Sequence, residues 1–147
     1  MSKDIILSNG GISIDDRGEL TYFNSVNLKK IKRFYVMNNH ENKFIRAWHA
    51  HKKESKIISV LSGAALICAV KIDNWKYPNK NSKIYRKVLS EKNPQMIQIP
   101  KGYANGTMTL SKNTKLIFFS DSTLEESIDD DYRFPFDYWD PWNIVQR

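Results

Sequence analysis

The sequence predicts an all-β fold, an antiparallel sandwich or barrel made of many short strands. Short stretches rich in β-branched and aromatic residues are separated by turn signals roughly every eight to twelve residues. Only residues 123–128 have the pattern of a helical turn or two. No repeat, coiled coil or linker interrupts the 147 residues, so residues 1–147 are expected to form one domain.

The first half of the chain contains a hairpin and four further expected strands. The turn signal at residues 15–18 lies between two extended stretches, residues 12–14 and 20–23. The polar residues 38–42 are expected to form a loop in which His40 is solvated. The further strands are expected at residues 31–37, 45–51, 56–61 and 64–72, the last of them buried.

The second half continues the strand pattern and ends in a dense group of aromatic residues. A polar excursion at residues 74–82 precedes strands expected at residues 84–89, 95–99, 108–110 and 115–119. The aromatic residues beyond it are too dense for an exposed tail, so they are expected to pack over the barrel or across a dimer interface. They are Tyr132, Phe134, Phe136, Tyr138, Trp139 and Trp142.

The composition limits the class of partner. A formal net charge of +7 favours an anionic partner, but Lys and Arg are scattered along the chain, which argues against nucleic acid. The longest apolar run, residues 64–70, is far shorter than the ~20 residues needed to cross a bilayer. The first residues make a poor signal peptide, and Cys68 is the only cysteine, expected to be a buried, inert thiol. A cytoplasmic protein without membrane contact is therefore expected.

Ionisable residues crowd at residues 45–63, where chemistry is most clearly indicated. His49 and His51 are separated by one residue, so on a strand both imidazoles face one space, roughly 7 Å apart along the chain. Strict alternation places Arg46 on the other face, and a bulge near Ala47 would be needed to bring it round. The alternative is that both histidines are satisfied by carboxylate or backbone partners and have no chemical role.

This His-x-His pair, with Gly63 and the later Pro-x-Gly at residues 100–102, resembles the motifs of metal-binding cupins, which are jelly-roll barrels. The glutamate position of the cupin motif holds Ser55 or Lys56, and the histidine position holds Asn105. Glu54 is one residue early and is expected to face away from the histidines. A transition metal needs three or four N, O or S ligands, so no metal ion or other cofactor is expected.

Two longer segments resemble the sugar-nucleotide branch of the cupins, the RmlC-like proteins. IPKGYANGTMTLS, residues 99–111, is similar to a segment of the 3,5-epimerases that act on dTDP-4-keto-6-deoxyglucose. RAWHAHKK, residues 46–53, is similar to a segment of the WxcM-like dTDP-4-keto-6-deoxyhexose 3,4-ketoisomerases. DDRGEL, residues 15–20, and IKRFYV, residues 31–36, resemble both groups. The resemblance implies a homodimer that binds a nucleotide sugar, most often dTDP-linked, with UDP and GDP left open.

The resemblance also implies roles for residues outside the histidine pair. Arg17 and Arg46 would contact the diphosphate, as guanidinium groups bind phosphate bidentately; the alternative for Arg17 is a turn residue paired with Asp16. Tyr35 and Tyr103 would stack on the base or donate to the sugar, or else serve as amphipathic barrel residues. Asn105 would line the substrate site.

The chemistry implied for the histidines is proton transfer beside a ketone. His49 would take the C3 proton, and His51 would polarise the C4 oxygen or relay the proton back at C4. An epimerase also needs a tyrosine to protonate the opposite face, and the matching stretch, residues 121–123, has no phenol. We therefore expect a 3,4-ketoisomerase that makes a deoxysugar for a surface glycan such as lipopolysaccharide O-antigen. A 3- or 3,5-epimerase and a non-catalytic nucleotide-sugar-binding cupin are the alternatives.

Overall fold

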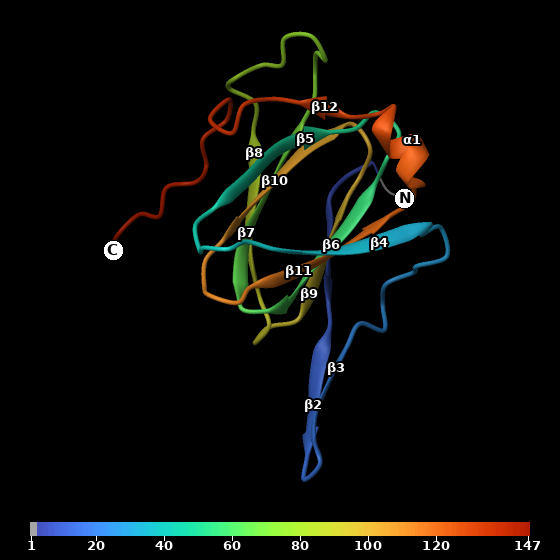
Figure 1. Ribbon diagram of the computed structural model, residues 1–147, viewed down its shortest axis with the longest axis vertical. Helices are drawn as coiled ribbons and strands as arrows, with labels where there is room; N and C mark the ends of the chain where they lie inside the picture. The colour runs from blue at the N-terminus through green and yellow to red at the C-terminus, as the bar shows by residue number, and fades with distance from the viewer. Residues whose placement is uncertain (1–2) are drawn as a thin grey trace.

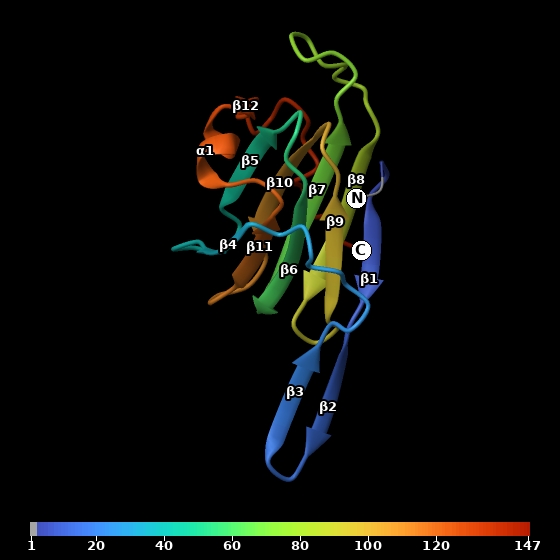
Figure 2. The same cartoon turned by 90° about the vertical axis from the view of Figure 1, so that its right-hand side faces the viewer.

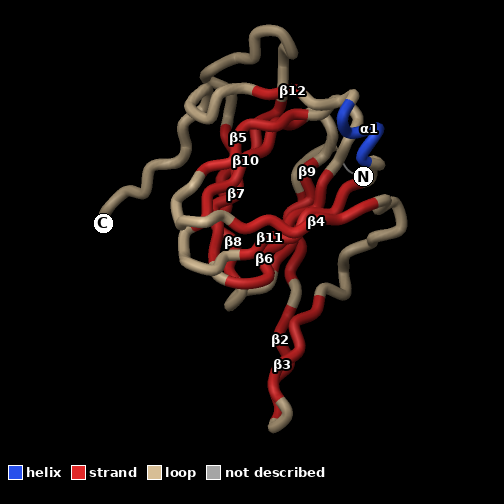
Figure 3. Tube along the Cα trace, viewed as in Figure 1, coloured by secondary structure: helices blue, strands red, loops and turns tan. Residues whose placement is uncertain are grey.

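The computed structural model describes residues 3–147, which form two antiparallel sheets, a separate hairpin and one short helix (Figures 1 and 3). The strands of one sheet lie in the order β1 (Ile6–Asn9), β9 (Gln95–Ile99), β6 (Lys56–Ser62), β11 (Lys115–Ser120) and β4 (Arg33–Asn38). The other sheet has the order β12 (Tyr132–Arg133), β5 (Ile45–Ala50), β10 (Tyr103–Thr109), β7 (Ala64–Lys71) and β8 (Ile84–Ser90). The predicted all-β class is confirmed.

The two sheets face each other around an apolar core. Alternation along β6 places Ile58 and Val60 inside, whereas Leu61 is half exposed. On β7, Ile67 and Ala69 join this core, while Leu66 and Cys68 belong to a second cluster on the outer side of the same sheet. The sheet containing β7 is therefore buried on both faces.

The C-terminal aromatic segment supplies the cover for that outer face. Trp139 and Trp142 are buried in the second cluster, and both rings lie against Trp48, at centroid distances of 5.4 and 5.2 Å. The Trp48 indole N–H donates to the carbonyls of Phe136 and Trp139. The prediction that these aromatics pack over the barrel is confirmed for all of them except Phe136, which is exposed. Cys68 lies beneath them, and burial raises the pKa of its thiol to about 12.

The hairpin predicted around residues 15–18 consists of β2 (Gly11–Asp15) and β3 (Gly18–Tyr22). It projects away from the barrel, as two views at right angles show (Figures 1 and 2). Gly18 has a φ of 137°, a conformation that favours glycine, at the tight end of the hairpin.

One strand is longer than the sequence pattern predicted, and two further strands were not predicted. β10 begins at Tyr103, not at residue 108, because pairing with β5 and β7 on both sides outweighs the poor strand propensity of its Asn and Gly. β1 and β12 are short edge strands whose own residues carry little pattern.

The one helical segment predicted from the sequence is present as α1 (Leu124–Ile128). Thr123 caps it, and Glu126 completes a capping box by accepting from the Thr123 backbone N–H. No helix within residues 3–147 has the length and apolar character needed to cross a membrane.

Candidate functional site

A cavity of about 310 Å³ lies between the sheets at the end of the barrel that α1 borders. Strands of both sheets contribute to it, with β4 and β6 from one and β5 and β10 from the other. It brings together five of the seven predicted site residues, His49, His51, Arg46, Tyr35 and Asn105.

A bulge in β5 places Arg46 on the same side as the histidines. In the pairing of β5 with β10, Asn105 lies opposite His49 and Thr107 lies opposite Arg46, so Gly106 faces two residues, Ala47 and Trp48. The extra residue reverses the alternation, so Arg46 and His49 both line the cavity. A side chain at position 106 would collide with Ala47 and Trp142, so only glycine lets the two strands and the C-terminal segment approach this closely.

His51 is held in one orientation with a single free nitrogen. The residue is only 4% exposed, and its Nδ1 lies 2.6 Å from the Asp130 carbonyl and 3.2 Å from Glu54 Oε2. A carbonyl can only accept, so Nδ1 carries the hydrogen and Nε2 carries the lone pair. Within residues 3–147, Nε2 is buried without a hydrogen-bond partner. Burial and the nearby Lys56 charge lower the pKa of His51, so the ring is a neutral base.

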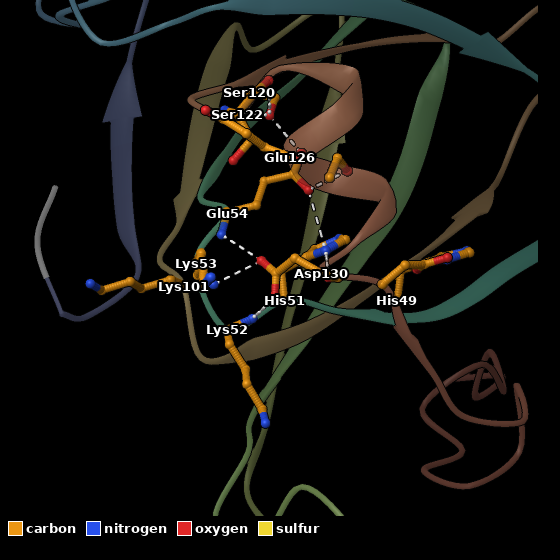
Figure 4. A network of polar contacts seen from close by, with 12 residues as sticks. His49, His51, Lys52, Lys53, Glu54, Lys101, Ser120, Ser122, Glu126 and Asp130 are labelled. Atoms are coloured by element: carbon orange, nitrogen blue, oxygen red, sulfur yellow. Dashed lines mark hydrogen bonds and ion pairs between the residues drawn. The ribbon is translucent and has the colours of Figure 1, made fainter.

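Asp130 anchors the loop that follows His51. Its buried carboxylate accepts the backbone N–H groups of Lys52, Lys53 and Glu54 at 2.8, 2.8 and 3.0 Å, as Figure 4 shows. These contacts hold the Asp130 carbonyl against the His51 ring.

Glu54 was predicted to face away from the histidines, and this prediction is wrong. β5 ends at Ala50 and the chain turns through residues 52–55, so strand alternation no longer applies there. The Glu54 carboxylate is buried and contacts the His51 ring. It also accepts from the hydroxyls of Ser120 and Ser127 at 2.5 and 2.7 Å.

The Glu54 carboxylate remains ionised in this buried position. Burial alone would raise its pKa, but the Lys56 charge and the hydrogen bonds from Ser120 and Ser127 lower it below the ordinary value. Arg33 adds an ion pair at 3.1 Å. A charged carboxylate beside Nδ1 favours the tautomer that leaves Nε2 free.

Lys56 is a functional candidate that sequence reasoning missed. It occupies the glutamate position of the cupin motif, is only 7% exposed and lines the cavity. Burial lowers the pKa of its ammonium group. The available signal was a lysine opening an otherwise apolar strand, KIISV.

His49 lies apart from the His51–Glu54–Asp130 network, as Figure 4 shows. It is half-buried and lines the cavity. Burial, then the charges of Lys56 and Arg133, lower its pKa to about 4. The cavity therefore contains two imidazoles that are both neutral at pH 7.

The remaining cavity wall is rich in cations. Arg33, Arg46 and Arg133 line it together with Lys56, and Asp131 is the carboxylate among its lining residues. Arg33 is paired with Glu54 and Arg133 with Asp131. The wall still has an excess of positive charge, which favours an anionic ligand. Within residues 3–147, no group of three or more His, Cys, Asp or Glu residues is placed to hold a metal ion.

Two predicted site residues lie outside the cavity. Arg17 is at the tip of the projecting hairpin and is paired with Asp15 at 2.6 Å, not with Asp16. Tyr103 packs against the inner core. His40 is exposed in the loop between β4 and β5, as expected.

Comparison with known proteins identifies related folds. The family model for dTDP-4-dehydrorhamnose 3,5-epimerase matches residues 3–134. A comparison with curated protein sequences finds no match.

Among solved structures, dTDP-4-dehydrorhamnose 3,5-epimerase from Bacillus anthracis, with TDP and PPi bound, superposes with a TM-score of 0.76. The two are 25% identical, and the match covers 97% of this chain and 87% of that one. The epimerase from Sulfolobus tokodaii gives 0.76 at 26% identity, covering 95% and 82%. A 3,4-ketoisomerase from Helicobacter canadensis gives 0.68 at 22% identity, covering 92% and 94%, and shares the fold. Epimerases and ketoisomerases are thus both built on this jelly-roll barrel.

Proposed function

This chain belongs to the dTDP-4-dehydrorhamnose 3,5-epimerase family, and we propose that within it the protein is a 3,4-ketoisomerase of a nucleotide-linked 4-keto-6-deoxy sugar. It is an RmlC-like cupin and an enzyme of the nucleotide-sugar epimerase and isomerase class, as its motifs predicted. The observation that supports the proposal best is the buried, unpartnered Nε2 of His51 in the same cavity as His49.

The first step is removal of the C3 proton, which the neighbouring 4-keto group acidifies. His49 is assigned as the base because it is neutral and lines the open cavity. Negative charge then develops on the C4 oxygen. We assign Lys56, which is buried in the cavity wall, to stabilise this oxygen through its Nζ group.

The second step returns a proton at C4 and moves the carbonyl to C3. The Nδ1 hydrogen of His51 is donated to the Asp130 carbonyl, so Nε2 carries the lone pair and accepts a proton from the substrate. This geometry favours proton relay over polarisation of the C4 oxygen, the two roles left open by the sequence. His51 Nε2 takes the proton of the C3 hydroxyl and delivers it to C4, while protonated His49 gives the former C3 proton to the C4 oxygen. Both histidines end neutral, so the reaction needs no further acid.

The epimerase alternative is supported by one observation. Tyr35 lines the cavity from β4, in the sheet opposite the histidine strand. Burial, then the Glu54 charge, raise the pKa of its phenol to about 12, so it remains protonated. It is a candidate for the acid that protonates the other face of the sugar.

Residues around the reaction centre are proposed to bind the rest of the substrate. We assign Arg46 to the diphosphate, and Tyr35 and Asn105 to the sugar or base, with dTDP as the expected nucleotide. Arg17 lies in the turn of the β2–β3 hairpin, which projects away from the barrel (Figure 1), so its contact with a ligand requires the homodimer that we also propose. Tyr103 lies outside the cavity, so it is given no substrate contact in this proposal. We further propose that residues 1–147 form one cupin domain. The protein is proposed to be cytoplasmic and to act in surface-glycan synthesis.

The test is incubation with dTDP-4-keto-6-deoxyglucose in D₂O, followed by NMR. We expect loss of the C3 proton signal and migration of the carbonyl from C4 to C3. Exchange at C5 without migration would select the epimerase. Tight dTDP binding without exchange at either carbon would select the non-catalytic binding protein. His49→Asn should abolish turnover while leaving dTDP affinity within about threefold of wild type.

A further inference from the structure

Asn39 connects the loop after β4 to the arginine assigned to the diphosphate. Its Oδ1 accepts from Arg46 Nε at 2.8 Å. Its Nδ2 donates to the Phe44 carbonyl and to Thr109 Oγ1, both at 3.1 Å. The amide orientation is fixed by chemistry, because a guanidinium nitrogen only donates and a carbonyl only accepts.

The contact through Nε leaves the outer end of the Arg46 side chain available. Arg46 lines the cavity, and none of residues 3–147 accepts a hydrogen bond from its Nη1 or Nη2. These two nitrogens form the fork that matches two phosphate oxygens. The side chain is otherwise exposed, so without Asn39 it would have many rotamers to lose on binding.

We propose that Asn39 is a positioning residue, which holds the Arg46 guanidinium in the orientation that binds the diphosphate of the nucleotide sugar. The inference rests on the proposed function and adds a residue to its binding site. It explains why a neutral amide is suited to this place, since a carboxylate would offset the Arg46 charge that the ligand needs. It also explains why lysine would not serve at position 46, because lysine has no second nitrogen for the amide to hold while the first binds phosphate.

The experiment is calorimetric titration of dTDP into wild type, Asn39→Ala, Arg46→Met and the double variant. We expect Asn39→Ala to weaken dTDP binding about five- to tenfold through the loss of preorganisation. Arg46→Met should weaken it at least as much. In the Arg46→Met background, Asn39→Ala should change the affinity less than about twofold, because the side chain it positions is gone. In turnover, Asn39→Ala should raise KM with little change in kcat.

Thr109→Val is the matched control for a role in folding the loop. It removes one loop contact of Asn39 and leaves the contact with Arg46, so dTDP affinity should stay within about twofold of wild type. The inference is overturned if Asn39→Ala binds dTDP as wild type does. It is equally overturned if its loss persists in the Arg46→Met background, or if Thr109→Val reproduces it. Failure of wild type to bind dTDP would instead overturn the proposed function, and the inference with it.

Discussion

The two histidines of the cavity are both neutral, but their surroundings differ. His51 is fixed by Asp130 and Glu54 through Nδ1, whereas His49 owes its low pKa mainly to burial and to the charges of Lys56 and Arg133. A base that is neutral at pH 7 can accept a proton without first losing one. The pair therefore suits a reaction in which protons are taken and returned.

The pKa of His49 predicts how stability depends on pH. It is about 4 in the folded protein and near 6.5 in the unfolded chain. Between these values the unfolded chain binds a proton that the folded protein does not, so stability falls as pH drops from about 6.5 to about 4. Urea unfolding midpoints measured across this window should decrease, and less steeply for His49→Asn. His40→Asn, in an exposed loop, should follow wild type; an unchanged slope in His49→Asn would contradict the assigned environment.

Replacing Tyr35 by phenylalanine removes only the phenol oxygen, and this change should affect a ketoisomerase and an epimerase differently. In a ketoisomerase the histidines return the proton, so Tyr35→Phe should keep kcat within about tenfold of wild type. An epimerase that used this phenol as its acid would lose about 10²- to 10⁴-fold. NMR of the reaction in D₂O measures both. Tyr77→Phe, in the exposed excursion, controls for general effects of removing a phenol, and a collapse of carbonyl migration in Tyr35→Phe alone would argue against our assignment.

Among the structural elements, the site depends on the contact between the loop that follows β5 and the segment that follows α1. The Asp130 carboxylate accepts hydrogen bonds from three backbone N–H groups of the loop that follows β5. Removing its carboxylate leaves them without their partner, and one of them, on Glu54, is buried.

We therefore predict that Asp130→Ala lowers the free energy of unfolding by about 2–4 kcal/mol. Turnover should fall as well, because the loop no longer holds the carbonyl that orients His51. Urea denaturation and the kinetic assay measure the two effects. Asp129→Ala, at the exposed neighbouring position, should change stability by less than about 0.5 kcal/mol. Equal stability of the two variants would show that the contact between the two segments does not depend on the carboxylate.

The sequence predicted those elements whose information is local. The hairpin, the β5 strand and the short helix each follow from a turn signal, an alternation or a local helical pattern. The bulge near Ala47 was expected from the resemblance, which implies that Arg46 reaches the histidine face. Glu54 and Lys56 could not be placed, because the chain leaves β5 after Ala50 and only tertiary contacts decide where those side chains point.

In the molecule as a whole, contacts within a single chain do not account for the projecting hairpin of β2 and β3. It projects from the barrel with Ile14 and Leu20 exposed by 74% and 66%. An isolated two-stranded hairpin is only marginally stable in water, and exposed apolar side chains on it favour contact with another surface. A second copy of this chain is the partner that the resemblance to the sugar-nucleotide cupins implies.

We accordingly predict that light scattering coupled to size exclusion gives about twice the chain mass of 17.2 kDa at micromolar concentration. Leu20→Glu should shift the protein toward the monomer, because a charge on the hairpin cannot be buried without a partner. Val145→Glu, at an exposed apolar position of the C-terminal segment, is the matched control and should remain dimeric. If Arg17 reaches the diphosphate in the dimer, Arg17→Ala should weaken dTDP binding in the wild-type background and have no effect in the Leu20→Glu monomer. A wild-type protein that elutes as a monomer would remove this role for Arg17 and leave Arg46 as the proposed phosphate contact.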